Sequence, residues 1–309
     1  MLNLLNVTFM GILRLIPSGI GEGLAWGILA LGVYISFRVL DVADMSVDGT
    51  LALGGVVTAV LVANGTNVVL AILISVISGA VAGAITGLMH TKLKIPAILS
   101  GILMMFALYS VNIHIMSGKS NVSLLKQPTL LNLLSDWLQI DRSVINIIVF
   151  ALFAAMVIAA IYWFFGTKLG SAIRATGCNL QMARAQGIDT DSKVIIGLAI
   201  SNGLAALAGS LIAQKDSNAT VDMASGAIVI GLASIVIGEL IFKKNLPFWA
   251  KLAGVIVGSI IYRLIIMLAL QMPFAETYDM KLITAILLVL AMSVTVIKKR
   301  HHKKEAKHA

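Results

Sequence analysis

Long apolar runs follow one another along almost the entire chain, and they restrict the fold more than any other feature. Runs of roughly 18 residues or more are long enough to cross about 30 Å of hydrocarbon as helices. Only 12% of the 309 residues are charged, whereas soluble domains carry about 25%. Helices satisfy their own backbone hydrogen bonds in lipid, and the runs do not alternate as the strands of a β-barrel would. The sequence therefore predicts an all-α fold, a polytopic membrane helical bundle.

Charged and turn-forming residues divide the chain into about nine predicted spans, within a range of eight to ten. The spans cover residues 20–39, 48–63, 67–89, 95–116, 143–166, 194–213, 225–242, 249–270 and 280–297. Residues 1–17 contain Arg14 and Pro17 and form either an amphipathic surface helix or a short tenth span. We expect residues 1–309 to form a single transmembrane domain.

Lysine and arginine residues predict the orientation of the spans. Cations gather in the loop with Lys92 and Lys94, in residues 168–193, in the loop with Lys243, Lys244 and Lys251, and in the basic tail 298–309. All four segments can lie in the cytoplasm together, as the positive-inside rule requires. Residues 118–141, 214–224 and 271–279 then lie outside. We expect a multi-pass protein of the bacterial cytoplasmic (inner) membrane with a cytoplasmic C-terminus.

The net charge of +9 comes largely from the C-terminal tail. In a soluble protein such a tail would suggest nucleic acid as a partner. In a membrane protein, attraction to anionic lipid at the cytoplasmic surface explains it more simply. Membrane lipid is therefore the expected partner of the tail, and no nucleic-acid partner is expected.

An acidic stretch, FRVLDVADMSVDGTLALGG at residues 37–55, follows the first long span. Ionisable side chains inside a membrane are costly and are functional candidates by default. Asp44, Ser46, Asp48 and Gly49 open the second span and are candidates for a substrate pathway. The alternative is that Asp48 caps a helix and does nothing more, since an aspartate in the first turn complements the helix dipole.

Other polar residues lie near the ends of predicted spans. Asn112, late in the fourth span, is a further pathway candidate. Asp41 is expected to form an ion pair with Arg38, and Glu239 an i,i+4 pair with Lys243. These last two carboxylates are therefore given structural roles.

Two similar sequences open glycine-rich spans on opposite sides of the predicted membrane. Asp44-Met45 precedes one of them, and Asp222-Met223 precedes the other. Such a pair is typical of inverted repeats, in which interrupted helices build the transport site. We therefore predict an inverted repeat with discontinuous helices near residues 41–49 and 216–226, and Asp222 joins the pathway candidates.

The longest predicted cytoplasmic connection is KLGSAIRATGCNLQMARAQGIDTDSK, residues 168–193. Its composition favours helix, Asn179 can cap a helix, and Gly187 can end one. A short helix that is exposed to the cytosol without a domain of its own must dock on something. The residue pattern leaves open whether it docks on a partner protein or lies on lipid.

This segment resembles the conserved cytoplasmic loop of permease subunits of binding-protein-dependent ABC importers of the branched-chain amino-acid and ribose type. The positions that match the family pattern are Gly170, Arg174, Ala175, Gly177, Asn179, Ala183, Arg184 and Gly187. Three stretches are similar to sequences of a subgroup linked to aromatic amino-acid (tryptophan/tyrosine) uptake. They are the acidic stretch at residues 37–55, the stretch HTKLKIPAILSGILMMFALYSVNIHIMSGKSNVSLL, and the stretch VIGLASIVIGE. The resemblance covers about residues 20–297.

The resemblance implies that residues 168–193 form coupling helices that dock on an ABC ATPase subunit. Arg174 and Arg184 would seat this loop, and Gly177 would allow a turn between its short helices. It also implies an extracellular or periplasmic solute-binding protein, a second permease copy (a homodimer or a close relative), and a small-molecule substrate, an aromatic amino acid. ATP would be hydrolysed by the partner, so this chain would be a transport subunit without a cofactor, and not an enzyme.

Two other functions stay open at this point. The chain could be an ion-coupled secondary transporter that uses Asp44, Asp48 or Glu239, or a membrane scaffold that recruits a cytosolic partner. Residues 117–120, SGKS, look like the end of a P-loop, but the required first glycine is replaced by Ile113. No HExxH, CxxC or GxSxG motif is present, so neither a metal site nor a catalytic residue is expected.

Overall fold

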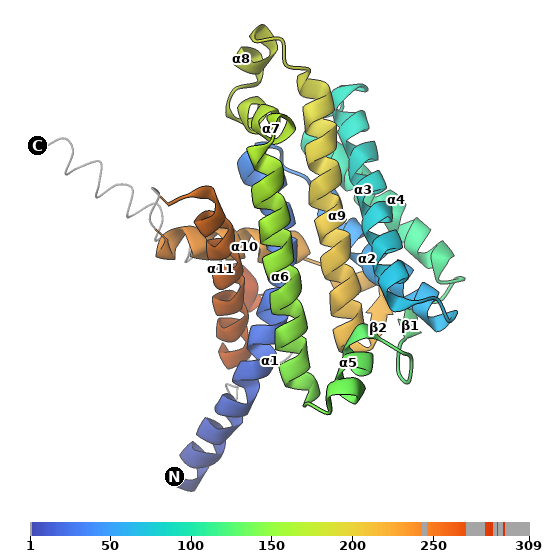
Figure 1. The fold of residues 1–309 in the computed structure, drawn as a ribbon, viewed down its shortest axis with the longest axis vertical. Helices are drawn as coiled ribbons and strands as arrows, with labels where there is room; N and C mark the ends of the chain where they lie inside the picture. Colours follow the sequence, from blue (N-terminus) through green and yellow to red (C-terminus); the bar gives the residue numbers. More distant parts are fainter. Residues whose placement is uncertain (1, 243–245, 270–281, 287–288, 290–292, 294–309) are drawn as a thin grey trace, which may run out of the picture.

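The structure is a computed structural model that describes residues 2–242, 246–269, 282–286, 289 and 293, with side chains from residue 16 onward. Long helices run side by side between two ends of the molecule (Figure 1). The elements, in order, are α1 (Leu2–Tyr34), a π-helical turn η1 (Ile35–Val39), α2 (Ser46–Ala63), α3 (Val68–Thr91), α4 (Ala97–Ile115), β1 (Asn121–Ser123), α5 (Leu130–Leu138), α6 (Arg142–Gly166), α7 (Lys168–Cys178), α8 (Leu180–Ala185), α9 (Thr190–Asp216), β2 (Asn218–Thr220), a 3₁₀ turn η2 (Val221–Ala224), α10 (Ala227–Ile241) and α11 (Phe248–Ala269).

Eight helical segments of the described part are long and apolar enough to cross a membrane. They are Ile16–Val39, Ser46–Ala63, Val68–Thr91, Ala97–Ile115, Arg142–Gly166, Thr190–Asp216, Val221–Ile241 and Phe248–Ala269. Each matches one of the first eight predicted spans within a few residues, so the prediction of an all-α polytopic bundle is confirmed. Most of the ninth predicted span (280–297), the loop 271–279 and the tail 298–309 lie outside the described residues.

The N-terminal residues do not form a helix of their own. Residues 2–17 are the first turns of α1, which continues through Pro17 to Tyr34. Whether these first turns lie on the membrane surface or cross it, the two alternatives given for this segment, stays a prediction.

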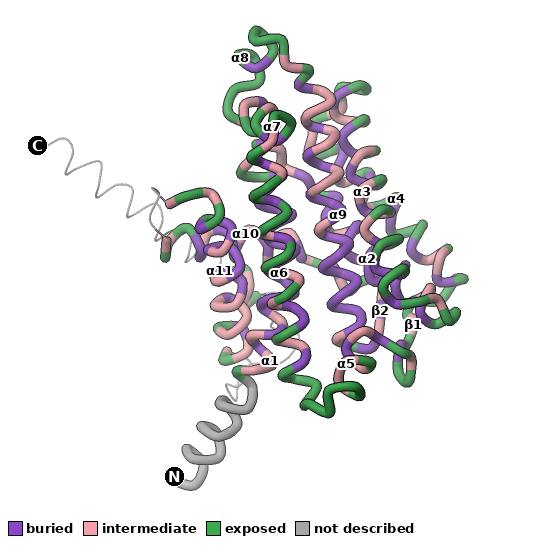
Figure 2. Tube along the Cα trace, in the orientation of Figure 1, coloured by how far each residue is buried: buried purple, intermediate pink, exposed green. Residues whose placement is uncertain are grey.

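The centre of the bundle is built from α1, α2 and α9, whose spans are 83%, 78% and 72% buried (Figure 2). The spans formed by α3, α4 and α6 are only 28–39% buried. Their exposed faces carry large apolar side chains such as Ile77, Phe106 and Leu152. Apolar surface of this extent is unusual on a soluble monomer. It is suited to contact with lipid tails or with a second chain.

Glycines bring the central helices into backbone contact. A Cβ at Gly54 of α2 would lie 2.1 Å from the carbonyl oxygen of Ala206 in α9. A Cβ at Gly209 would lie 1.9 Å from the carbonyl oxygen of Leu51. Small residues are typical of interfaces between membrane helices. In lipid the hydrophobic effect does not drive helices together, so close packing has to supply the attraction. The α2–α9 contact therefore depends on glycine at both positions.

Two interruptions break the helical pattern, close to the predicted places. Residues 40–45 separate η1 from α2, and residues 217–226 lead from α9 through β2 and η2 into α10. At the second interruption β2 pairs with β1 in antiparallel register, with Asn121 opposite Thr220. The prediction of discontinuous helices is confirmed, although α2 is already helical from Ser46. The inverted symmetry of the two halves stays a prediction.

The predicted grouping of the loops agrees with the fold. Lys92 and Lys94 lie within 3.5 and 3.8 Å of Asp191, at the same end as α7 and α8. Strands β1 and β2 lie at the opposite end (Figure 1). We call these the α7–α8 end and the β1–β2 end. Two of the segments predicted to be cytoplasmic, the loop with Lys92 and Lys94 and residues 168–193, thus share an end of the described part of the molecule.

Candidate functional site

A buried polar cluster holds the break between η1 and α2. The side chain of Asp44, which is 3% exposed, accepts hydrogen bonds from the backbone N–H of Ser46 (2.8 Å) and from its hydroxyl (2.6 Å). Nδ2 of Asn202, midway along α9, donates to the other carboxylate oxygen at 2.7 Å. Thr50 donates to the amide oxygen of Asn202 at 2.6 Å. Asp44 is therefore satisfied within the chain, and it ties the break to α9.

Asp48 reaches a different helix from the one on which it lies. Its carboxylate accepts hydrogen bonds from the backbone N–H groups of Gly226 (3.1 Å) and Ile228 (2.8 Å) at the start of α10. The first N–H groups of a helix have no partner within it, and a negative charge is favourable there. Asp48 thus caps α10 and joins the two interruptions of the fold. The alternative that Asp48 caps a helix is confirmed, although the helix is α10 and not α2; a role in the substrate pathway stays a prediction.

Of the remaining pathway candidates, Gly49 and Asn112 lie together and Asp222 lies apart from them. A Cβ at Gly49 would lie 3.1 Å from the Cα of Met105, so α2 packs closely on α4 there. Asn112 of α4 is buried; its Nδ2 lies 3.5 Å from the carbonyl oxygen of Gly49, and its Oδ1 has no hydrogen-bond partner among the described residues. Asp222 is exposed in η2. Among the described residues its side chain joins neither Asp44 nor Asp48.

Arg38 forms a different ion pair from the expected one. Arg38 of η1 pairs through Nη2 with Glu239 of α10, whereas Asp41 and Lys243 were the expected partners. The chain leaves the helix at Leu40, and Asp41 adopts a left-handed φ of 56°. It is therefore not on the helical face of Arg38. Lys243 lies outside the described residues.

Residues 168–193 form two short helices, α7 and α8, followed by the start of α9, at one end of the molecule (Figure 1). The side chain of Asn179 accepts a hydrogen bond from the N–H of Met182 at 2.9 Å and so caps α8. Gly187 has a φ of 77° just after α8 ends. Both local predictions for this segment are confirmed.

Gly177 makes a close contact that was not predicted. It is the last residue but one of α7, directly before the junction with α8, and a Cβ there would meet the carbonyl oxygen of Val39 at 1.9 Å. Gly170 similarly permits contact with the end of α6, where a Cβ would lie 2.3 Å from the carbonyl oxygen of Phe164. Helix α7 is thus packed directly against the break that follows η1, with Ala175 half-buried beside Gly177.

The two arginines of this segment differ in their contacts. Arg184 donates through Nε to the hydroxyl of Thr190 (2.7 Å) and through Nη2 to Asp191 (2.8 Å). It therefore holds α8, with its buried Ala183, against the start of α9. Two hydrogen bonds from Ser192 lower the pKa of the neighbouring Asp189 below its ordinary value. The one from the Ser192 side chain has the larger effect and the one from its backbone N–H the smaller.

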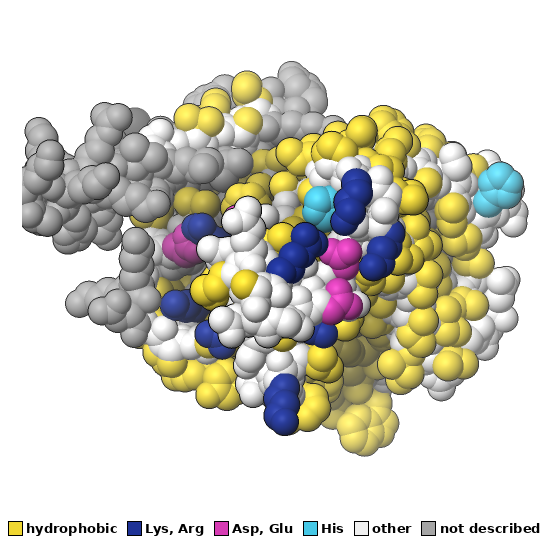
Figure 3. Space-filling view, turned by 90° about the horizontal axis from the view of Figure 1, so that it is seen from above, with side chains coloured by type: hydrophobic (Ala, Val, Ile, Leu, Met, Phe, Trp, Pro, Cys, Tyr) yellow, Lys and Arg dark blue, Asp and Glu magenta, His cyan; other side chains and the backbone are white. Residues whose placement is uncertain are grey.

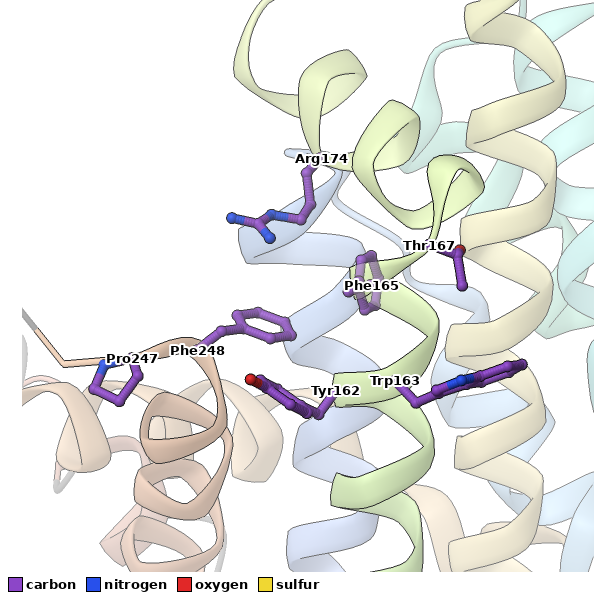
Figure 4. Close-up of a pocket in the computed structure, with 8 residues that line it drawn as sticks. Tyr162, Trp163, Phe165, Thr167, Arg174, Pro247 and Phe248 are labelled. Carbon is purple, nitrogen blue, oxygen red and sulfur yellow. The ribbon is translucent and has the colours of Figure 1, made fainter.

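Arg174 is exposed, and its side chain extends over the start of α11. Its guanidinium lies 5.4 Å from the centre of the Phe248 ring. Together with Tyr162, Trp163 and Phe165 it lines a hollow of about 560 Å³ (Figure 4). Seen from the α7–α8 end, lysine and arginine side chains gather in the middle of this face, and hydrophobic side chains surround them (Figure 3). The α7–α8 end thus offers a cationic surface to a partner.

A cluster of charged residues near the β1–β2 end was not predicted. Glu22 of α1 lies 2.5 Å from Nζ of Lys215 in α9 and 3.1 Å from Nε of Arg263 in α11. These side chains are only 23%, 14% and 12% exposed. The sequence contains one signal from which this cluster could have been predicted. Glu22 and Arg263 are each a single charged residue within an apolar run.

Known proteins with similar sequences agree with this architecture. The family described as "Branched-chain amino acid transport system / permease component" matches residues 15–292. The "Tyrosine transport system permease protein" of Clostridioides difficile (strain R20291) is 42% identical over 89% of both chains. An uncharacterized protein of Rickettsia prowazekii (strain Madrid E) is 33% identical over 86% of this chain and 92% of its own. The "Ribose import permease protein RbsC" of Escherichia coli (strain K12) is 27% identical over 86% and 81%.

No solved structure matches the chain. The family match covers all eight membrane-crossing segments of the described part. The chain therefore belongs to the family of branched-chain amino acid transport system permease components.

Proposed function

We propose that this chain is the membrane permease of a binding-protein-dependent ABC importer, and that α7 and α8 dock on its ATPase subunit. The observation that carries the proposal is the contact between α7 and the break after η1. Because Gly177 brings the α7 backbone against Val39, a force on α7 acts directly on residues 35–45. Residues 168–193 would then be the coupling segment.

The contacts of the break suggest how such a force would spread. Asp44 links the break to Asn202 in the middle of α9, and Asp48 links α2 to the start of α10. Arg184 links α8 to the start of α9. Packed elements respond to a local shift by moving as rigid bodies. ATP binding by the partner would thus move η1, α9 and α10 together and change which end of the pathway is open.

The same contacts argue against an ion-coupled transporter. Asp44 is fully hydrogen-bonded, Asp48 caps α10, and Glu239 is paired with Arg38. None of the three is free to exchange a proton or sodium ion without breaking a contact that holds the bundle.

The substrate that we propose is an aromatic amino acid, and the tyrosine transport permease at 42% identity supports it. A solute-binding protein would deliver it at the β1–β2 end, which would face outward. A second copy of the chain would cover part of the exposed apolar surface and enclose the pathway, and lipid would cover the rest. The α7–α8 end and the C-terminus would face the cytoplasm of a bacterium.

Copurification tests the docking surface. The ATPase subunit should copurify with the wild-type chain and with Lys119→Glu, which makes the same charge change at the β1–β2 end. It should be lost with Arg174→Glu, while the melting temperature of the permease stays within a few degrees of wild type. Retention of the ATPase by Arg174→Glu would contradict the assigned surface.

Transport by the purified chain alone, driven by an ion gradient without ATP, would contradict the importer itself. Recruitment of a soluble partner other than an ATPase, without transport, would do the same and would favour the membrane scaffold.

A further inference from the structure

A second hollow is lined in part by Lys215 and Asp216 at the end of α9, directly before β2, and so lies near the β1–β2 end. Its volume is about 280 Å³, and α1, α9, α10, α11 and the segment before α10 all contribute to its lining. This is just below the roughly 300–1,000 Å³ of sites for drug-sized ligands. It therefore suits a ligand of the size of one amino acid.

The lining of this hollow contains two cations and two carboxylates. Lys215 contacts both Glu22 (2.5 Å) and Asp216 (3.1 Å), and Arg263 contacts Glu22 at 3.1 Å. Glu22, Lys215 and Arg263 all lie on helices long and apolar enough to cross a membrane. Charged groups in such positions are costly and usually functional. The formal charges of the four side chains cancel, which matches a zwitterion better than an anion or a cation.

Contacts with Trp26 and Glu22 fix the position of the Arg263 guanidinium, but among the described residues they do not occupy all of its N–H donors. The guanidinium stacks over Trp26 with its carbon 4.9 Å from the ring centre. Its Nε is buried and forms no hydrogen bond among the described residues, although Glu22 lies at ion-pair distance. A guanidinium has five N–H donors in a fixed arrangement that matches a carboxylate. Among the described residues none accepts a hydrogen bond from this guanidinium, which leaves its donors for a ligand.

The rest of the lining is apolar. Trp26 and Met223, with Ala25, Ile212 and Ile230, supply the surface beside the charges. Sites for small ligands commonly combine such a surface with a few polar groups that fix orientation. An aromatic or large aliphatic side chain would contact this surface while its charged end met the ion cluster.

We propose that this hollow is a weak binding site for an α-amino acid in its zwitterionic form. Arg263 and Lys215 bind the α-carboxylate, Asp216 and Glu22 bind the α-ammonium group, and Trp26 and Met223 contact the side chain. The choice of an amino acid rests on the proposed function. The site binds weakly because a ligand has to compete with the existing pairs between Glu22 and its cations.

Saturation-transfer NMR on the full-length chain in lipid nanodiscs tests the site, with the ATPase subunit present and the solute-binding protein absent. The probes are L-tyrosine, tyramine, which lacks the carboxylate, and 3-(4-hydroxyphenyl)propionate, which lacks the ammonium group. L-tyrosine should bind, and each of the other two should bind at least about tenfold more weakly, because each loses charge-assisted contacts.

Two variants separate ligand binding from a purely structural ion network. Asp216→Asn changes a half-exposed side chain at the rim of the hollow, and it should weaken L-tyrosine binding about tenfold without lowering the melting temperature. Arg263→Gln should weaken it further. The matched control is Asp136→Asn, the same change on the exposed face of α5 at the same end, and its binding should equal that of wild type.

The proposal is overturned if L-tyrosine does not bind at millimolar concentration, if tyramine binds equally well, or if Asp216→Asn binds like wild type. If the assembled importer takes up tyrosine with ATP but its permease fails these binding tests, the proposed function is supported and this site is rejected. Conversely, a chain that binds tyrosine here but has no ATP-driven uptake would retain the site and lose the proposed function.

Discussion

Asp48 connects parts of the chain that lie about 180 residues apart. It is placed on the first turn of α2, and its two carboxylate oxygens accept hydrogen bonds from the start of α10. The contact combines a cap with a favourable charge at a helix N-terminus. At the scale of single residues it is the clearest link between the two interruptions of the bundle.

Replacing Asp48 should reveal both contributions. Asp48→Ala removes acceptor and charge and should cost about 1–2 kcal/mol of stability, whereas Asp48→Asn keeps an acceptor and should cost less. Asp41→Asn is the matched control, because Asp41 is exposed and Asn also tolerates a left-handed φ. Denaturant or thermal unfolding in detergent would rank the three variants. Equal stabilities for Asp48→Ala and Asp41→Asn would contradict the cap.

Gly177 is required by close packing and not by backbone conformation. Gly177→Ala would place a methyl group against the carbonyl of Val39, and overpacking of this kind costs about 1–3 kcal/mol. The control is Gly166→Ala at the end of α6, where a Cβ meets no atom within 4 Å. The first variant should melt at a lower temperature and transport poorly, and the second should match wild type. Wild-type stability of Gly177→Ala would mean that α7 does not pack on the break.

The sequence identified which residues at the break matter, but not what they contact. Asp44 and Asp48 stand out because charges are rare in apolar runs. Their partners, Asn202 and Ile228, lie about 160 and 180 residues further along the chain, and no local pattern links them. The same limit explains why two other features were not predicted. They are the contact of Gly177 with Val39 and the cluster at Glu22, whose partners come from α9 and α11.

The element that organises the fold is the interruption before α2. Backbone groups at a break cannot follow the helical hydrogen-bond pattern and have to be satisfied inside the protein. Asp44, Ser46, Thr50 and Asn202 form a connected network that meets this need. Their positions in the middle of the bundle fix the start of α2 relative to α9.

A double-mutant cycle on this network should show strong coupling. Asp44→Ala and Asn202→Ala should each destabilise the protein by about 1.5–3 kcal/mol, since each leaves a buried polar partner unsatisfied. The double variant should lose less than the sum of the two, because the contact between Asp44 and Asn202 is already lost in each single variant, with an interaction energy of about 1–3 kcal/mol. Additive effects in unfolding measurements would show that the contact does not hold the break.

At the scale of the whole molecule, the spans were predictable and their arrangement was not. The thickness of a bilayer fixes the length of an apolar helix, so the first eight spans could be placed within a few residues. Helices α1, α2 and α9 form the centre, but α2 and α9 are no more apolar than their neighbours. What distinguishes the α2–α9 contact is small residues, Gly54 and Gly209 among them, which permit close packing without specifying a partner.

The orientation of the bundle can be tested with its single cysteine. Cys178 is exposed in α7, and the account places it in the cytoplasm. In cells that lack the ATPase subunit, a membrane-impermeant maleimide should label it in inside-out vesicles but not in intact spheroplasts. In a Cys178→Ser background, Asp136→Cys on α5 should show the reverse pattern. Labelling of Cys178 from outside would invert the topology.

The most direct test of the central claim is uptake into proteoliposomes that contain this chain and its ATPase subunit, with the solute-binding protein outside and no ion gradient. The account predicts uptake of L-tyrosine or another aromatic amino acid that requires ATP on the side of α7 and α8. Uptake should be lost with Arg174→Glu and kept with Lys119→Glu. Uptake that needs an ion gradient and proceeds without ATP would contradict the account.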